Sequence, residues 1–397
     1  MTTSAAPFDS RLAPIFTEVK GDGEPQHFWH RKANDVRMER LDGIVHLYRY
    51  TDILTVNRHP AVLGQGGRGS ILGSNSALIP LELDGPGHVK YRKLLDPLFA
   101  PKRVALLEAS FRALARELID SFSHEKTVDL YDRFCVPLPC LTFLRLLGAP
   151  TEDLTFFLEF KDAVIHAKGD TAEEKTASAA VAGAKLYEYL NALIDARREH
   201  PPRDDLLGAL MQGTVDGEPV SQLELLNMLF LLMFAGLDTV TASMSCIFAW
   251  LARHPEQRDR LVRNPEAIRA AVEELLRYES PVPAGTRYAT EDIDLGGEVI
   301  HAGEAIHAIW SAANVDPTAT ESPMDVKFDR PRNVHMVFAS GTHRCLGSHL
   351  ARLELRLAIE ELHRRFPRYG ITRDDEPRYD NIAVRMVEYL PITLDVG

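Results

Sequence analysis

Residues 338–347 of the chain read FASGTHRCLG, and this stretch decides how the rest of the sequence is interpreted. A loop containing Gly341 leads to Cys345, and a helical pattern of leucines follows at once. Unpaired N–H groups and the positive dipole end at a helix start both favour a thiolate. Gly341 and Gly347 permit tight turns and the close approach of a flat ligand. The stretch is compatible with a ligating thiolate, but a small buried cysteine is the commoner state of a lone cysteine, and that alternative stays open on these residues alone. A zinc site is disfavoured because no second cysteine lies near.

Composition narrows the class of protein. The 397 residues are 45% hydrophobic and 26% charged, which excludes disorder, and the net charge of -12 argues against general nucleic-acid binding. The longest apolar run, residues 228–237, is shorter than the ~20 residues of a membrane span. The N-terminus has no basic segment followed by an apolar stretch, so we expect no signal peptide. Four scattered cysteines fit reduced thiols and a cytoplasmic location.

The hydrophobic pattern predicts a mainly helical fold with a smaller β-rich part. Apolar residues recur every three or four positions in several stretches, and no regular alternation of strand and helix runs through the chain, which disfavours a doubly wound sheet. We expect helices over residues 51–59, 104–122, 182–198, 264–278 and 346–366. We expect strands within residues 43–50, 286–309 and 382–396, and a loop over residues 64–76.

A further long helix is expected to start at Ser221. Ser221 and Glu224 form a capping-box pattern before an apolar run, and no proline follows until Pro255. About 30 residues would span ~45 Å, and a helix apolar on all sides should run through the core. Gly236 and Thr239 in its middle suggest a local distortion.

The residues around the cysteine resemble the haem loop of the cytochrome P-450 family of haem-thiolate monooxygenases. The matching positions are Phe338, Gly341, His343, Cys345 and Gly347. The resemblance implies haem b as cofactor, with Cys345 as the axial ligand of its iron. It also implies one mainly α triangular unit with a smaller β-rich subdomain, forming a single catalytic domain over residues 1–397.

The middle of the long helix resembles the family's oxygen-activation motif. The matching string is Ala235-Gly236-Leu237-Asp238-Thr239. The resemblance implies that Thr239 and Asp238 are catalytic, Thr239 as a hydrogen-bond donor to the reacting oxygen and Asp238 as a proton relay. It implies that Ala235 and Gly236 lie against the haem, where Gly236 leaves room for dioxygen.

Other signatures of the family recur in the expected order. Glu274 and Arg277 match its Glu-x-x-Arg element, and Arg332 matches the arginine of the downstream meander. The resemblance implies that these three form a buried network that retains the haem. It also implies that cationic side chains hold the two haem propionates, namely His88, Arg92, Arg287 and His343.

Motif alignment places the substrate against mostly apolar positions, so we expect a lipophilic terpenoid, steroid, fatty acid or aromatic compound. These positions are Leu78, Ile79, Leu231, Phe234, Val282, Pro283, Ala284, Ala383 and Val384. Without a flavin fingerprint or a cysteine cluster in the chain, electrons should come from a ferredoxin-type partner with its NAD(P)H-dependent reductase. We expect that partner on a basic face made by Lys90, Lys93, Lys102, Arg103, Arg344, Arg352 and Arg356.

Three other functions stay open at this point. A peroxide-driven peroxygenase usually lacks the acid–alcohol pair, so Asp238 and Thr239 argue against it. A non-oxidative haem-thiolate isomerase would form product without O2 or an electron donor. A haem-binding sensor would not turn over, so a reduced sample with substrate would consume no oxygen.

Overall fold

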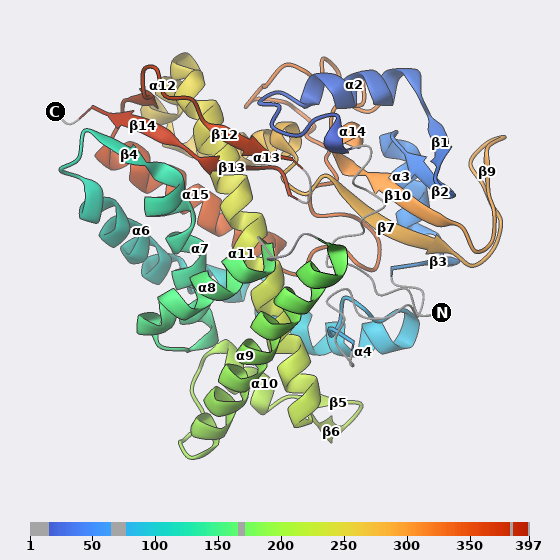
Figure 1. Ribbon diagram of the computed structural model, residues 1–397, viewed down its shortest axis with the longest axis horizontal. Helices are drawn as coiled ribbons and strands as arrows, with labels where there is room; N and C mark the ends of the chain where they lie inside the picture. Colours follow the sequence, from blue (N-terminus) through green and yellow to red (C-terminus); the bar gives the residue numbers. More distant parts are fainter. Residues whose placement is uncertain (1–15, 65–76, 166–170, 382–383, 396–397) are drawn as a thin grey trace. The chain divides into compact units, whose positions relative to one another are not determined.

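The computed structural model describes residues 16–64, 77–165, 171–381 and 384–395 (Figure 1). Helices predominate, and the strands form one five-stranded sheet and several sheets of two or three strands. The prediction of a mainly helical fold with a smaller β-rich part is confirmed. The chain divides into two compact units, here called unit 1 and unit 2. The single catalytic domain over residues 1–397 stays a prediction.

Unit 1 is almost entirely helical, and polar side chains cap the starts of α9 (Ala172–Arg198) and α10 (Leu206–Met211). Thr171 forms a capping box with Glu174, and the side chain of Asp205 accepts from the N–H of Gly208 at 2.8 Å. Its elements are α4 (Gly85–Leu95), η2 (Asp96–Phe99), α5 (Pro101–Ala105), α7 (Pro137–Leu147), η4 (Thr151–Asp153), α8 (Leu154–Ile165), α9 (Ala172–Arg198), α10 (Leu206–Met211), β5 (Thr214–Val215), β6 (Glu218–Pro219) and the first part of α11 (Gln222–Arg253).

Aromatic side chains pack the helices of unit 1 on one another. Phe230 of α11 stacks on Tyr187 of α9 with ring centroids 4.8 Å apart, and it meets the edge of Phe160 of α8 at 5.9 Å. The hydroxyl of Tyr187 donates to the buried amide oxygen of Asn227 at 2.6 Å. A buried polar group is thereby satisfied inside an apolar contact.

Unit 2 combines the main sheet with the helix that follows the cysteine loop. Its helices are α2 (Gln26–Asp35), α3 (Tyr50–Arg58), α6 (Glu108–Phe122), the second part of α11, α12 (Pro255–Arg263), α13 (Ile268–Glu279), α14 (Trp310–Ala313) and α15 (Ser348–Arg365), with the short turns η3 (Tyr131–Cys135) and η5 (Pro265–Ala267). Its strands are β1 (Met38–Leu41), β2 (Ile44–Leu47), β3 (Val62–Leu63), β4 (Thr127–Asp129), β7 (Ala284–Ala289), β8 (Ile293–Asp294), β9 (Val299–Ile300), β10 (Ala305–Ile309), β11 (Tyr369–Ile371), β12 (Arg378–Asp380), β13 (Met386–Tyr389) and β14 (Pro391–Leu394).

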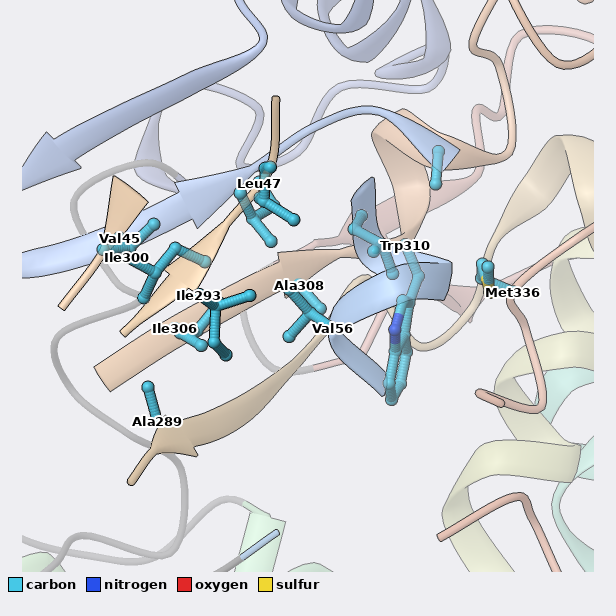
Figure 2. Close-up of a cluster of buried hydrophobic side chains, with 13 residues drawn as sticks. Val45, Leu47, Val56, Ala289, Ile293, Ile300, Ile306, Ala308, Trp310 and Met336 are labelled. Carbon is cyan, nitrogen blue, oxygen red and sulfur yellow. The ribbon is translucent and has the colours of Figure 1, made fainter. Parts of the chain in front are cut away.

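The five-stranded sheet has the order β1-β2-β10-β7-β3, in which only β2 and β10 run parallel. Because side chains alternate along a strand, Val45 and Leu47 of β2 share one face with Ile306 and Ala308 of β10. That face carries the hydrophobic cluster drawn in Figure 2, which also includes Trp310. The cluster fixes the sheet against α3 and α14.

Helix α11 runs unbroken for 32 residues, close to the expected length. The predicted capping box is confirmed, because the N–H of Ser221 donates to Glu224 at 2.8 Å and that of Glu224 donates back to the Ser221 hydroxyl at 3.3 Å. Among the described residues this is the one helix long and apolar enough to cross a membrane. Its most apolar window is 72% buried within the protein, as a core helix would be.

Two expected helices differ in extent from those observed. The helix expected over residues 104–122 divides into α5 and α6 at a turn over residues 106 and 107, where Leu106, counted as part of the apolar stripe, is 70% exposed. Helix α9 begins ten residues before the expected 182, at Ala172. Its first three turns are rich in alanine, so helix propensity and the Thr171 cap extend it without an apolar pattern. The loop expected after Gly64 lies outside the described residues.

Candidate active site

The loop before α15 is closed by its own backbone hydrogen bonds. The N–H of Cys345 donates to the carbonyl of Phe338 at 2.9 Å, and the N–H of Arg344 donates to the carbonyl of Gly341 at 3.2 Å. Two residues, Ala339 and Gly341, have positive φ angles of 52° and 77°. The loop therefore doubles back and delivers Cys345 to the start of the helix.

The tip of this loop rests on the end of α3. A Cβ on Gly341 would lie 1.9 Å from the carbonyl oxygen of Asn57, so both the φ angle and the space require glycine. The side-chain amide of Asn57 also donates to the hydroxyl of Ser340 at 3.2 Å. The close approach expected at Gly341 is thus made to another part of the chain. Asn57 was not identified from the sequence, since it belongs to no motif.

Cys345 differs from the other three cysteines in its exposure. Cys135, Cys140 and Cys246 are buried, whereas Cys345 is exposed, and within the described residues none of the four forms a disulfide. Burial raises the pKa of the Cys246 thiol to about 12, so that sulfur stays protonated. Cys345 instead lies three residues before the first residue of the 18-residue helix α15, beside the positive end of its dipole.

The residues present fit a thiolate-ligated haem. Cys345 presents an accessible sulfur on a loop that backbone hydrogen bonds hold in place. A cysteine thiolate is one of the ligands that proteins provide to haem iron. A Cβ placed on Gly347 would meet nothing within 4 Å, so the described residues leave open space beside this glycine, two residues after the cysteine. In the described residues no group of three or more histidine, cysteine or acidic side chains could hold a metal by itself.

Two of the expected propionate ligands belong to unit 2. Arg287 lies on β7, is 9% exposed, and donates through Nη1 to the carbonyl of Thr286 at 2.7 Å. The ring of His343 packs on Gly64 so closely that a Cβ there would lie 2.6 Å from its Nε2. Both side chains are therefore held in place by neighbouring backbone.

The other two expected propionate ligands belong to α4 of unit 1. His88 and Arg92 are one helical turn apart and share a face, as the sequence predicted. His88 is 3% exposed. Arg92 forms an ion pair with Asp96, the first residue of η2, through a 2.7 Å contact, so its charge is partly balanced by a neighbouring carboxylate.

The predicted distortion in the middle of α11 does not interrupt the helix, which stays α-helical through Ala235 and Thr239. Residues 241–250 are all buried, whereas Ala235 is exposed and both Asp238 and Thr239 are half-buried. A Cβ on Gly236 would meet the ring of Phe143 at 3.6 Å, an ordinary contact. The acid and the alcohol thus lie just before the fully buried part of the helix, and one carboxylate oxygen of Asp238, Oδ1, is itself buried.

The expected substrate positions fall into three groups. Leu78, Ile79, Leu231, Pro283 and Ala284 are buried. Phe234, Val282 and Val384 are half-buried. Ala383 lies outside the described residues.

The buried network around Glu274 is present, but its third member is Arg330. Arg277 and Glu274 are fully buried and form an ion pair at 2.8 Å. Arg330 donates to the Glu274 carboxylate at 3.1 Å, and the amide of Asn333 does so at 3.1 Å. The expectation for Arg332 is wrong, because this residue is exposed. Two arginines flank Pro331, and the motif alone could not tell which one turns inward.

The basic residues expected to receive an electron donor are partly neutralised. At least four of the seven form ion pairs, Lys90 with Asp216, Arg103 with Asp204, Arg352 with Glu273, and Arg356 with Glu108 and Glu360. The other three, Lys93, Lys102 and Arg344, are exposed. The expected face is therefore less basic than its sequence suggests.

Comparisons with known proteins agree with this geometry. The family model for cytochrome P450 matches residues 171–381. Cytochrome P450 CYP107DY1 of Priestia megaterium is 32% identical over 87% of this chain and 88% of its own length. The steroid C26-monooxygenase of Mycobacterium tuberculosis strain H37Rv is 32% identical over 87% of this chain and 87% of its own.

Solved structures give the same result. CYP109E1 of Bacillus megaterium in complex with testosterone matches with a TM-score of 0.84 and 27% identity, over 94% of this chain and 98% of that chain. A mutant of P450 EryK in complex with erythromycin B matches with a TM-score of 0.84 and 28% identity, over 96% of this chain and 97% of that chain. The chain therefore belongs to the cytochrome P450 family, and it is an oxidoreductase that uses haem b with a cysteine thiolate as iron ligand.

Proposed function

We propose that this protein hydroxylates a lipophilic small molecule with one atom of O2, using electrons from a separate ferredoxin-type protein and its NAD(P)H-dependent reductase in the cytoplasm. The reaction is RH + O2 + 2 electrons + 2 protons → ROH + water. The observation that carries the proposal is the exposed Cys345 on a hydrogen-bonded loop at the start of α15. The names of relatives support the substrate class, since they include a steroid C26-monooxygenase and a mycinamicin IV hydroxylase/epoxidase.

In this proposal Cys345 ligates the iron, and the side chains of Arg287 and His343 bind the propionates. His88 and Arg92 stay proposed propionate partners on the resemblance alone. When bound, the haem supplies the oxygen chemistry, helped by electron donation from the thiolate. Phe338, Gly341 and Gly347 shape the loop that presents the sulfur, and the first two do so through the carbonyl contacts described above.

The side chains of α11 would handle the protons. Thr239 offers a hydroxyl that can donate to the reacting oxygen, and Asp238 beside it can take a proton from solvent and pass it on. Both residues are half-buried, and the buried residues 241–250 that follow them hold this part of the helix in place. Ala235 and Gly236 present little side-chain bulk at this level of the helix, which leaves room for a small reactant.

The substrate would meet mainly apolar side chains. Leu231 is buried and Phe234 is half-buried on α11, and Val282 and Pro283 precede β7. Leu78, Ile79, Ala284, Ala383 and Val384 complete the proposed set. Removing apolar surface from water then supplies the binding free energy, at roughly 25 cal/mol per Å² buried.

The electron donor would dock through opposite charges. Lys93, Lys102 and Arg344 are exposed cations, and a small acidic ferredoxin would be attracted to such groups during encounter. Because these three side chains are open to solvent, we propose that they contribute most. Exchanging each for glutamine should lower the association rate most strongly at low ionic strength.

The test of the proposal is spectroscopic and chemical. The reduced carbon-monoxide complex of the wild-type protein should show the thiolate form of the Soret band, and Cys345→Ala should lose it. Steroids and macrolides should be screened for spin-state shifts, and turnover of any binder measured with and without O2 and reductant. Product formed with peroxide but not with O2 and reductant would indicate a peroxygenase. Product formed without any oxidant would indicate an isomerase. A wild-type protein that takes up no haem would overturn the proposal entirely.

A further inference from the structure

The face of Phe338 in the cysteine loop is covered by the guanidinium group of Arg352. The guanidinium carbon lies 4.3 Å from the ring centroid, close enough for a cation–π contact. Arg352 lies on α15, two helical turns after Cys345. Arg352 therefore connects α15, which follows the cysteine, to Phe338, which begins the loop that precedes the cysteine.

A carboxylate of another helix holds this arginine in a fixed orientation. Glu273 of α13 accepts from Nε of Arg352 at 2.6 Å and from Nη2 at 2.8 Å, which is a bidentate pair. Nε2 of His335 lies 3.1 Å from the same carboxylate, and the His335 ring lies 6.0 Å from that of Phe338. Arg352 thus has little freedom to leave the ring.

The carboxylate keeps its charge at neutral pH. Burial alone raises the pKa of Glu273, but hydrogen bonds from His335 and Arg352 outweigh burial and lower the pKa to about 2. Beside Phe338 there is consequently a full ion pair, one positive and one negative group. The next residue, Glu274, holds Arg277, so two consecutive carboxylates of α13 secure two different arginines.

Phe338 connects this pair to the cysteine. Its carbonyl oxygen accepts from the N–H of Cys345 at 2.9 Å, so a displacement of Phe338 moves the backbone that carries the sulfur. A connection from Arg352 to the cysteine therefore runs through the ring that the guanidinium group covers and through the hydrogen bond accepted by the carbonyl of Phe338.

We propose that Arg352 is a positioning residue for the Cys345 loop, that Glu273 holds it in place, and that the two opposite charges largely cancel at the iron ligand. This inference rests on the proposed role of Cys345. It assigns Arg352 an inward function in place of the surface contact with an electron donor expected from the sequence. As a balanced pair the two groups would leave the reduction potential of the iron nearly unshifted, whereas loss of either partner would shift it, because an uncompensated charge nearby favours one oxidation state.

The test uses charge-neutral variants of the holoprotein. Arg352→Gln leaves the Glu273 carboxylate uncompensated, so the reduction potential measured by spectroelectrochemistry should fall. Glu273→Gln leaves the guanidinium uncompensated, so the potential should rise. In the double variant neither charge remains, and the potential should return close to the wild-type value. If the pair had a merely structural role, the reduction potentials of both single variants would shift in the same direction, and that of the double variant would shift further still.

The matched control is Arg356→Gln, one turn farther along α15. Arg356 pairs with Glu108 at 2.6 Å and Glu360 at 2.9 Å, so its replacement removes the same charge from the same helix. The resulting shift should be clearly smaller than that of Arg352→Gln; an equal shift would overturn the inference.

A charge-conserving variant covers the case in which the glutamine variants lose haem. Arg352→Lys keeps the positive charge but loses the planar guanidinium group, which stacks on the Phe338 ring and donates two hydrogen bonds to the Glu273 carboxylate. It should change the iron–sulfur stretching vibration, whereas Arg356→Lys should leave it unchanged. An unaltered vibration in Arg352→Lys would refute the positioning role. Failure of the proposed function would appear separately, as a wild-type carbon-monoxide spectrum without the thiolate band.

Discussion

Replacement of Arg277 by alanine is expected to unfold the region that supports the cysteine loop. Arg277 belongs to α13 and is the largest fully buried side chain among the described residues. It donates twice to Glu274 at 2.8 Å, and it also donates to the carbonyls of Asn314 at 2.7 Å, Pro323 at 2.8 Å and Asp325 at 3.3 Å. One side chain therefore ties α13 to three points of the connecting chain between α14 and the cysteine loop.

The cost of the substitution follows from what it leaves behind. Burial alone raises the pKa of Glu274, and hydrogen bonds and charge from Arg277 outweigh burial and hold the pKa below its usual range. Without Arg277, the donors left to the buried carboxylate among the described residues are Arg330, Asn333 and the N–H of Lys327. Removing one partner of a buried ion pair costs about 3–5 kcal/mol. Since 1.4 kcal/mol is a factor of ten, the folded-to-unfolded ratio should fall by roughly two to three and a half orders of magnitude.

The measurement is the ratio of bound haem to protein after purification, together with the midpoint of urea unfolding. Arg198→Ala is the matched control, because Arg198 and Asp195 form an i, i+3 pair whose side chains are 51% and 65% exposed. An exposed pair contributes at most about 1 kcal/mol, so this variant should keep its haem and its midpoint. Equal midpoints for Arg277→Ala and Arg198→Ala would refute the assignment of the buried network to stability.

Three further changes test other parts of the molecule. Thr239→Ala should leave substrate-induced spin-state shifts intact but release hydrogen peroxide in place of product, measured per NAD(P)H consumed; full coupling would contradict a proton-handling role. Gly341→Ala should abolish haem binding, since the new methyl would overlap the Asn57 carbonyl at a φ of 77°, whereas Gly303→Ala, also at positive φ but in open space, should retain it. Burial alone raises the pKa of Glu361, but hydrogen bonds from three arginines outweigh it and lower the pKa to about 2. The stability supplied by ionised Glu361 is therefore fully present above its unfolded pKa of about 4.5 and is lost as the pH falls towards 2. The gap in unfolding midpoint between the wild type and Glu361→Gln should narrow over that interval, and a gap independent of pH would exclude this linkage.

The sequence by itself determined the features that depend on local order and spacing. The capping residues Ser221 and Glu224 and the run without proline fixed α11, and the loop pattern before Leu346 fixed where the cysteine stands relative to its helix. Helix formation and loop closure are governed by neighbours within a few residues, so these features can be inferred from a single chain. The length of α9 was underestimated because its alanine-rich first turns form a helix without an apolar pattern that the sequence analysis could detect.

Which of several chemically similar residues points inward could not be predicted from the sequence and followed from the folded chain. Arg330 and Arg332 both follow Phe328, and only Arg330 reaches Glu274. Arg352 carried the same charge in the sequence as Arg344, yet it is held by Glu273 against Phe338 while Arg344 is exposed. The physical reason is that burial of a charge is favourable only beside an opposite charge brought from a distant segment, and sequence spacing does not record that meeting.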